Sequence, residues 1–141
     1  SKNLLRELAE FTMTLEDEKV FLKNNNNSKH EYIAGAFIEN ILVGTAGFHG
    51  SGLQRIRHRS SIGISVLCKY HSHGIGSLLM KHIIDVAKKY DKQILELDVR
   101  VDNDHAIRLY KKYGFKEIGI RSNGFYVDDR YVDLLLMDKV L

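Results

Sequence analysis

The stretch HSHGIGS, residues 71–77, marks a boundary between two kinds of sequence pattern. Before it, residues 61–66 alternate small or polar side chains with apolar ones, which predicts a strand. After it, apolar residues recur at helical spacing from residue 75 to residue 87, with lysines on the opposite face. Backbone N–H groups at the start of a helix lack partners, and glycine lets an anion approach them closely. The stretch therefore predicts either an anion-binding turn or a plain strand-to-helix turn.

Segments before this stretch predict helices and then strands. Residues 3–23 place Leu4, Leu8, Phe11 and Leu15 near one helical face, with Thr14 as the cap of a second helix. A polar loop follows at residues 24–28. Residues 32–38 and 41–49 predict a hairpin with its turn at residues 39–40, and residues 55–67 predict a third strand.

Segments after the stretch predict one more strand, one more helix and a closing pair of strands. Residues 94–99 alternate as a strand does. Asn103 is a good helix cap ten residues before Tyr113, and Gly114 ends the helix. Residues 115–121 and 131–137 predict two strands joined by a loop around residues 128–129. The element order predicts a mixed sheet of the α/β (α+β) class, which differs from a pure doubly wound fold.

Composition limits the function classes. The chain has 141 residues, a net charge of +3 and one cysteine. This size predicts a single domain over residues 1–141, and the charge is too small to indicate a nucleic-acid partner. A lone cysteine excludes a disulfide framework, and no apolar run approaches the roughly 20 residues that span a bilayer. We therefore expect a cytoplasmic protein without a membrane partner.

Three signatures in order resemble the GNAT acetyltransferase superfamily. The family's loop, Arg/Gln-x-x-Gly-x-Gly/Ala, corresponds to residues 71–76, with histidine at the first position. Its later signature, Asn-x-x-Ala-x-x-x-Tyr-x-x-x-Gly-Phe, is matched in full over residues 103–115, and the ending of residues 131–137 is similar to that of many bacterial members. The resemblance covers residues 32–141. It implies the GNAT fold, a mixed central sheet with a splayed strand pair flanked by helices. Residues 1–23 look like the end of the family's N-terminal region, so we expect its first strand to be absent and the domain to be N-terminally incomplete.

The resemblance also implies acetyl-CoA as co-substrate and no metal. The residues that it assigns to acetyl-CoA are Ile64, Ser65 and Val66 along the pantetheine arm, His71, Ser72, His73, Gly74, Ile75, Gly76 and Ser77 around the pyrophosphate, and Asn103. Histidine at position 71 carries little charge at neutral pH, so cofactor binding is expected to be weaker or more dependent on pH than in relatives with arginine. Asn103 fits equally well as a simple helix cap.

For catalysis, the resemblance assigns Tyr110 as the general acid for the departing thiolate. Asp98 lies on the strand where some N-terminal-amine acetyltransferases of the family carry a glutamate that acts as base through water, so the resemblance makes the shorter Asp98 the candidate base. The alternatives are a core tyrosine at position 110 and a structural ion pair of Asp98, for example with Arg100 or Arg108. Glu31 and His49 remain further base candidates.

The function implied is direct transfer of acetyl from acetyl-CoA to a primary amine acceptor, either a small molecule or a protein N-terminus. The alternative is an acyl-CoA-binding sensor without turnover. Segments near residues 1–30 and 121–130 are expected to select the acceptor. The basic residues 55–59 are either a solvated hairpin or a contact for the CoA 3′-phosphate or an acidic substrate. Several members of the superfamily form dimers, so a homodimer is compatible with the resemblance.

Overall fold

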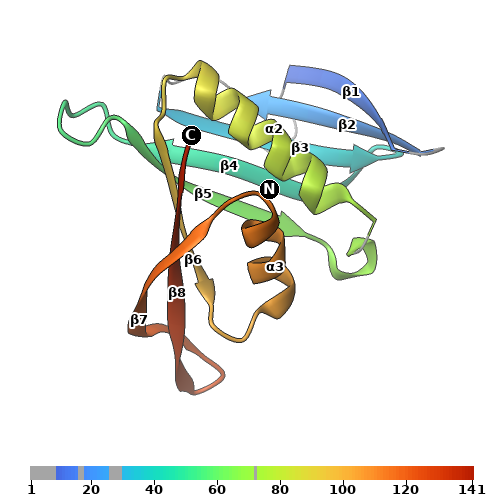
Figure 1. Ribbon diagram of the computed structural model, residues 1–141. Helices are drawn as coiled ribbons and strands as arrows, with labels where there is room; N and C mark the ends of the chain where they lie inside the picture. The colour runs from blue at the N-terminus through green and yellow to red at the C-terminus, as the bar shows by residue number, and fades with distance from the viewer. Residues whose placement is uncertain (1–8, 16–17, 26–29, 72) are drawn as a thin grey trace.

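One mixed sheet organises the chain. The computed structural model describes residues 9–15, 18–25, 30–71 and 73–141. In these residues eight strands run in the order β1-β2-β3-β4-β5-β6-β8-β7, and helix α2 crosses one face of the sheet (Figure 1). The strands are β1 Ala9–Leu15, β2 Glu18–Asn25, β3 Glu31–Ile38, β4 Ile41–Gly50, β5 Arg59–Val66, β6 Ile94–Arg100, β7 Lys116–Val127 and β8 Arg130–Val140, and the helices are α2 Ile75–Lys89 and α3 Asp104–Lys112.

The N-terminal region differs from the prediction. The helices predicted within residues 3–23 are wrong where the structure describes them, because β1 and β2 form an antiparallel pair that joins β3. The apolar residues Phe11, Met13 and Leu15 alternate with Thr12 and Thr14, a period of two that competes with the helical spacing. Pairing with the exposed edge of β3 satisfies the backbone groups of β2, which decides between the two patterns.

Tight turns join β3 to β4 and β7 to β8. Glu39 and Asn40 have φ angles of 50° and 67°, and Asp128 and Asp129 have φ angles of 52° and 60°. Two consecutive residues with positive φ form the turn whose twist suits adjacent antiparallel strands. The hairpin predicted at residues 39–40 is confirmed. The closing strands are longer than predicted, so most of residues 121–130 belongs to β7 and only a short turn remains as a loop.

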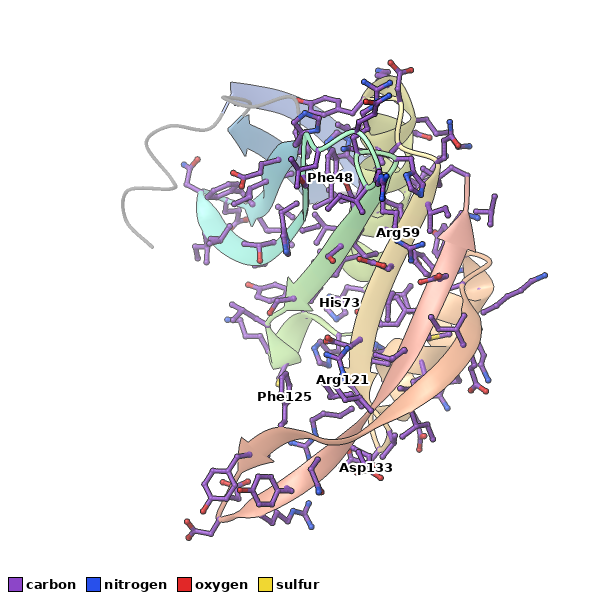
Figure 2. The ribbon with its side chains drawn as sticks, turned by 90° about the vertical axis from the view of Figure 1, so that its left-hand side faces the viewer. Phe48, Arg59, His73, Arg121, Phe125 and Asp133 are labelled. Carbon is purple, nitrogen blue, oxygen red and sulfur yellow. The ribbon has the colours of Figure 1, made fainter. Side chains whose placement is uncertain are left out.

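Strands β5 and β6 separate after a short paired start. They pair in parallel at Arg59 with Ile94, Ser60 with Leu95, and Ser61 with Glu96, and at no further position. Figure 2 shows the two strands diverging from that start. The far part of β5 therefore turns an edge without a strand partner toward β6. The mixed sheet with a splayed strand pair, expected from the resemblance, is confirmed.

The core lies between the sheet and its helices. Helix α2 buries Ile75, Leu79, Met80 and Ile83 against β3, β4 and β5. Helix α3 meets the start of α2, where the Tyr113 hydroxyl donates to the carbonyl oxygen of Ser77 at 3.2 Å. Burial of these apolar side chains, each worth about 1.5–3 kcal/mol, fixes α2 on the sheet. No helix among the described residues is long and apolar enough to span a membrane.

Candidate active site

We call the turn that leads into α2, residues 73–77, the glycine turn. A cavity of about 280 Å³ lies between the end of β5, the glycine turn and α3. It collects residues that are up to 46 positions apart in the chain. Seven of the predicted site residues line it, namely Ile64, Ser65, Val66, His71, Gly76, Asn103 and Tyr110. Tyr70, His105, Ala106 and Leu109 complete the lining. Ala106 belongs to the family signature, whereas the sequence did not single out Tyr70, His105 or Leu109.

The glycine turn leaves the first amide groups of α2 outside the helical hydrogen-bond pattern. Gly74 takes the left-handed conformation, with φ of 79°, as the residue before the helix. The first helical bond runs from the N–H of Leu78 to the carbonyl of Gly74 at 3.0 Å, so the N–H groups of Ile75, Gly76 and Ser77 precede it. These amides and the helix dipole favour an anion at this point.

Gly76 also lets α3 approach α2. A Cβ atom at this position would lie 3.2 Å from Cδ2 of Leu109, which is tighter than ordinary van der Waals contact. The side chain of Ile75 points the other way and is 1% exposed in the core. His73 is exposed, with its ring against Tyr70, and Ser72 lies outside the described residues.

His71 ties the turn to the end of β5. Its Nε2 atom lies 2.8 Å from the carbonyl oxygen of Val66, and its ring stacks on His105 with centroids 5.3 Å apart. Only an N–H can bond a carbonyl oxygen, so Nε2 carries the proton. A neutral imidazole has one N–H, so the remaining nitrogen can offer a lone pair but no donor. His71 donates a second bond, of the kind an anion accepts, only in its charged form.

Two cations that sequence reasoning missed flank the glycine turn. A second hollow, of about 230 Å³, is lined by Gly74, Gly76, Ser77, His105, Arg108, Leu109 and Lys112. Arg108 and Lys112 are four residues apart on α3, so they share one face of the helix. That spacing is visible in the sequence, but only the packing of α3 on α2 shows that the pair faces the turn.

Asn103 acts as a cap and lines the cavity. Its Oδ1 atom accepts a hydrogen bond from the N–H of Ala106 at 3.2 Å. The predicted cap is confirmed. The side chain also belongs to the lining of the 280 Å³ cavity, so both of its predicted roles fit the same position.

Tyr110 is 7% exposed and packs edge-on against Phe115, with centroids 5.9 Å apart. Burial raises the pKa of its hydroxyl, and the charge of Asp98 raises it further. Both effects disfavour the phenolate, so the hydroxyl keeps its proton across the neutral range. A protonated phenol at the wall of a cavity can donate a proton to a developing anion.

Asp98 lies on the other side of β6 from the core. It is exposed, as its place in the alternation predicts, while Leu97 and Val99 beside it are buried. The expected ion pair with Arg100 does not form, because Arg100 instead donates to Asp102 at 3.0 and 2.9 Å. Among the described residues no cation lies within ion-pair distance of Asp98. This carboxylate lines a different cavity from that of Tyr110, and only its charge acts on the phenol.

The cavity of Asp98 has a volume of about 380 Å³ and lies on the sheet face away from α2. Its polar lining residues come from five strands and are His49, Ser61, Glu96, Asp98, Arg121 and Asp138. Strand register explains how four of them meet, because His49 lies opposite Ser61, Ser61 opposite Glu96, and Glu96 opposite Asp138. Glu31 extends this line, since it lies opposite His49. We call this line of five side chains the polar row.

Arg59 lies where β5 meets β6 and bonds two members of the polar row (Figure 2). Its Nε and Nη2 atoms donate to Oε2 of Glu96 at 3.1 and 2.6 Å, and Nη2 also donates to Asp138 at 3.3 Å. Ser61 donates to the other oxygen of Glu96 at 3.3 Å. The second oxygen of Asp138 is buried without a hydrogen-bond partner in the described part of the chain.

The remaining basic residues lie away from the glycine turn. Arg55, Arg57 and His58 precede β5, at the opposite end of that strand from Val66. These three residues are therefore separated from the amides of the glycine turn by the length of the strand. The only cysteine, Cys68, is exposed, and the described residues contain no group of three or more side chains that could hold a metal ion.

Comparison with known proteins places this arrangement in a family. The sequence model of the acetyltransferase (GNAT) family matches residues 2–115. The chain is 33% identical over 100 residues to the N-alpha-acetyltransferase RimI of Mycobacterium tuberculosis, covering 71% of this chain and 61% of that protein. It is 35% identical over 104 residues to the L-amino acid N-acetyltransferase AaaT of Escherichia coli, covering 69% and 64%. The chain thus spans less than two thirds of the length of either relative.

Solved structures agree with the sequence comparison. A GNAT-family acetyltransferase from Streptococcus pneumoniae superposes with a TM-score of 0.79 at 28% identity, covering 82% of this chain and 70% of that one. A structure of yncA from Salmonella typhimurium with acetyl-CoA shares the fold, with a TM-score of 0.72 at 20% identity, covering 78% of this chain and 64% of that one. Because the family model matches most of the chain and the fold agrees with it, this chain belongs to the GNAT acetyltransferase family.

Proposed function

We propose that the chain is an N-acetyltransferase that moves an acetyl group from acetyl-CoA directly to a primary amine. The observation that carries the proposal is the 280 Å³ cavity, where the unpaired part of β5, the glycine turn and the buried Tyr110 meet. GNAT acetyltransferases use acetyl-CoA as the acetyl donor. A small molecule and a protein N-terminus are both retained as acceptor types, since the names of relatives include an N-alpha-acetyltransferase and an L-amino acid N-acetyltransferase.

The residues around this cavity suit acetyl-CoA in two respects. Beyond Ser61 the described residues leave the β6-facing edge of β5 without a strand partner, so backbone groups near Ile64 and Ser65 can bond the amides of an extended arm. The amides of the glycine turn, with Arg108 and Lys112 beside them, can bind phosphate groups. A chain of amides that ends in a pyrophosphate matches both features at once.

Two side chains supply proton transfers in this proposal. Asp98 accepts a proton, through water, from the acceptor ammonium, so that a neutral amine with a lone pair attacks the thioester carbonyl. The new C–N bond forms as the C–S bond breaks, and Tyr110 donates its proton to the departing sulfur. The amide nitrogen then loses its extra proton and Tyr110 is reprotonated, so the net products are an N-acetyl amine, CoA and one proton.

Two variants separate these roles. Tyr110→Phe should lower kcat by about 10²-fold or more, the size expected for a general acid, while acetyl-CoA still binds in calorimetry. Asp98→Asn should lower the rate mainly at low pH, where more of the acceptor is an ammonium ion that needs a base. Gly76→Glu adds bulk and negative charge at the glycine turn and should abolish acetyl-CoA binding.

The outcomes distinguish an acetyltransferase from an acyl-CoA-binding sensor without turnover. Acetyl-CoA binding that is lost in Gly76→Glu, together with no transfer to any amine in a broad panel, would favour a sensor and overturn the proposal. Transfer by Tyr110→Phe at the rate of the unmodified chain would overturn the role of the phenol alone.

We further propose a cytoplasmic single domain over residues 1–141, consistent with one exposed cysteine.

A further inference from the structure

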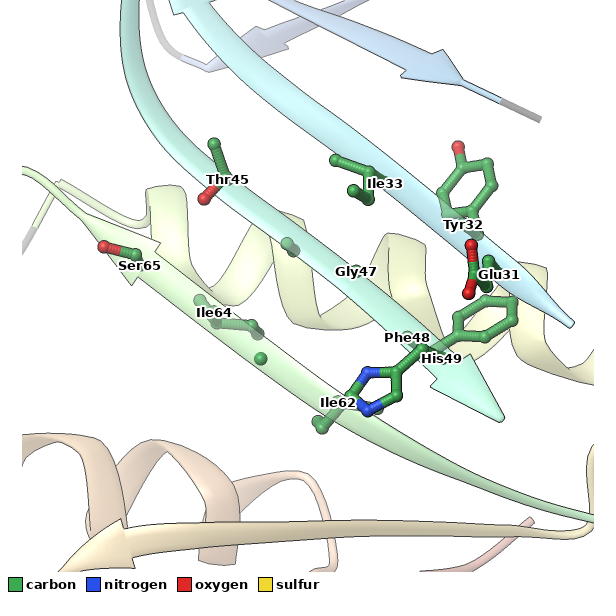
Figure 3. A pocket seen from close by; sticks show the side chains of 12 residues that line it. Glu31, Tyr32, Ile33, Thr45, Gly47, Phe48, His49, Ile62, Ile64 and Ser65 are labelled. Atoms are coloured by element: carbon green, nitrogen blue, oxygen red, sulfur yellow. The ribbon is translucent and has the colours of Figure 1, made fainter. Parts of the chain in front are cut away.

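A groove of about 640 Å³ crosses β3, β4 and β5 on the sheet face away from α2 (Figure 3). Gly44 identifies the faces, because a Cβ atom there would lie 3.0 Å from Leu79 of α2. Strand residues alternate, so Ala46 and Phe48 also face the helix, while Thr45, Gly47 and His49 face away. Figure 3 accordingly shows His49 in front of the strands and α2 behind them.

The floor of the groove has no side chains at its centre. Gly47 lies opposite Gly63 in the β4–β5 pair, and Ile33 lies opposite Gly47 in the β3–β4 pair. Ile33 is 40% exposed and leans over Gly47, since a Cβ atom at Gly47 would lie 3.2 Å from Cγ1 of Ile33. A Cβ atom at Gly63 would have no neighbour within 4 Å. Two facing glycines beside an isoleucine make a hollow that is flat and apolar.

The groove shares lining residues with both cavities of the proposed reaction. It shares Ile64 and Ser65 with the 280 Å³ cavity that Tyr110 lines. It shares His49 and Ile62 with the 380 Å³ cavity that Asp98 lines. A molecule in the groove is therefore adjacent to the cofactor cavity at one point and to the carboxylates at another.

The 380 Å³ cavity differs in chemistry from the apolar floor of the groove. The 380 Å³ cavity holds the carboxylates of Glu96, Asp98 and Asp138, and Arg59 pairs with the first and the last of them. Asp98 has no ion-pair partner among the described residues, and the buried Oδ1 atom of Asp138 has no hydrogen-bond partner there. The exposed carboxylate of Asp98, which lines this cavity without an ion-pair partner in the described part of the chain, therefore favours a cation there.

We propose that the acceptor is an amphipathic primary amine. Its ammonium group lies beside Asp98, and its apolar body lies on the floor formed by Gly47 and Gly63, against Ile33. The inference rests on the proposed acetyl transfer and adds the class of acceptor. It disfavours amines whose bodies are charged or strongly polar, because their polar groups would lose water over the glycine floor without gaining partners.

Gly63 allows a direct test. Valine suits a strand, and at this position its Cβ atom meets no neighbour, so Gly63→Val reduces the hollow while the sheet is expected to remain intact. Gly119→Val is the matched control, because Gly119 is also a strand glycine whose added Cβ atom meets nothing within 4 Å, and it does not line the groove. Melting temperatures of both variants check the fold.

The probes are 2-phenylethylamine and ethanolamine, which share a primary amine on a two-carbon chain. Burial of the phenyl group predicts kcat/KM about 10- to 100-fold higher for 2-phenylethylamine with the unmodified chain. Gly63→Val should reduce this preference about tenfold, and Gly119→Val should leave it unchanged. Calorimetric binding of 2-phenylethylamine to the chain saturated with CoA gives the same comparison without turnover.

Failure of the inference and failure of the proposed function give different results. If both amines are acetylated equally well, or if Gly63→Val lowers kcat/KM for both by the same factor, the apolar-body site is wrong while acetyl transfer stands. If neither amine is acetylated and 2-phenylethylamine does not bind the CoA-saturated chain, the inference is overturned. If no amine of a broad panel is acetylated, the proposed function fails as well.

Discussion

Removal of the Arg59 side chain tests how strongly its bonds stabilise the sheet where β5 and β6 begin to separate. Arg59 donates two hydrogen bonds to Glu96 and one to Asp138. It lies in the short stretch where three residue pairs join β5 to β6. A hydrogen bond to a charged group contributes about 1.5–3 kcal/mol when shielded, and an exposed ion pair about 0–1 kcal/mol. The Arg59 and Glu96 side chains are 33% and 39% exposed, so the lower part of the shielded range applies.

Arg59→Met keeps the length of the side chain and removes its charge. Glu96 and Asp138 then lie opposite each other on neighbouring strands with no cation between them, which adds repulsion to the lost bonds. Together these effects predict a loss of about 2 kcal/mol in the free energy of unfolding. For a chain of this length that is a fall of roughly 5–10 °C in melting temperature.

Urea denaturation and thermal melts of four chains measure the effect. Arg59→Met is compared with Arg55→Met, since Arg55 is an exposed arginine four residues earlier in the turn before β5. Glu96→Gln and the double variant with Arg59→Met complete a double-mutant cycle, in which a coupling energy near 1 kcal/mol is expected. The reasoning is refuted if Arg59→Met melts within 1 °C of Arg55→Met, or if the two changes in the cycle are additive.

Three further perturbations test the local structure. Asn103→Ala should lower stability by about 1 kcal/mol in urea titrations by removing the cap on Ala106, whereas Asn103→Asp should keep most of it; equal losses would contradict a capping role. Gly114→Ala should cost about 1 kcal/mol or more, because the φ of 91° strains any residue with a Cβ atom, and an unchanged melting temperature would contradict this. Burial lowers the pKa of His82 in the folded chain, so the unfolded chain binds the proton first as pH falls below 6.5. Folding stability should therefore decrease from pH 7.5 to pH 5.5, and His82→Gln should flatten that decrease in melts over this range.

Local sequence signals predicted the parts of the molecule that depend on neighbouring residues. The turn at Glu39 and Asn40, the helix start at Gly74 and the cap at Asn103 all appear where the sequence indicates them. Each depends on backbone geometry or hydrogen bonding within a few positions, and that chemistry is present in the residues themselves. The same holds for the burial of Leu97 and exposure of Asp98, which follow from the alternation of one strand.

The N-terminal segment shows where local reasoning failed. Helical and strand periodicities coexist in residues 3–15, and pairing of β1 with β2, which in turn pairs with β3, selected the strand over residues 9–15. The candidate site shows a second limit, because the sequence identified Tyr110 and Asp98 but not that they line separate cavities. Arg108 and Lys112 were likewise visible as a helical pair without any sign of what they face.

By itself the sequence determined the family, the strand-to-helix turn at Gly74 and the order of most elements, because motifs and periodicities are properties of consecutive residues. Only the tertiary structure decided the polar row, the partners of Arg59 and the facing glycines of the groove. Glu31, His49, Ser61, Glu96 and Asp138 come from five separate segments. They meet because strand register places them side by side, and a shift of one residue would turn each of them to the other face.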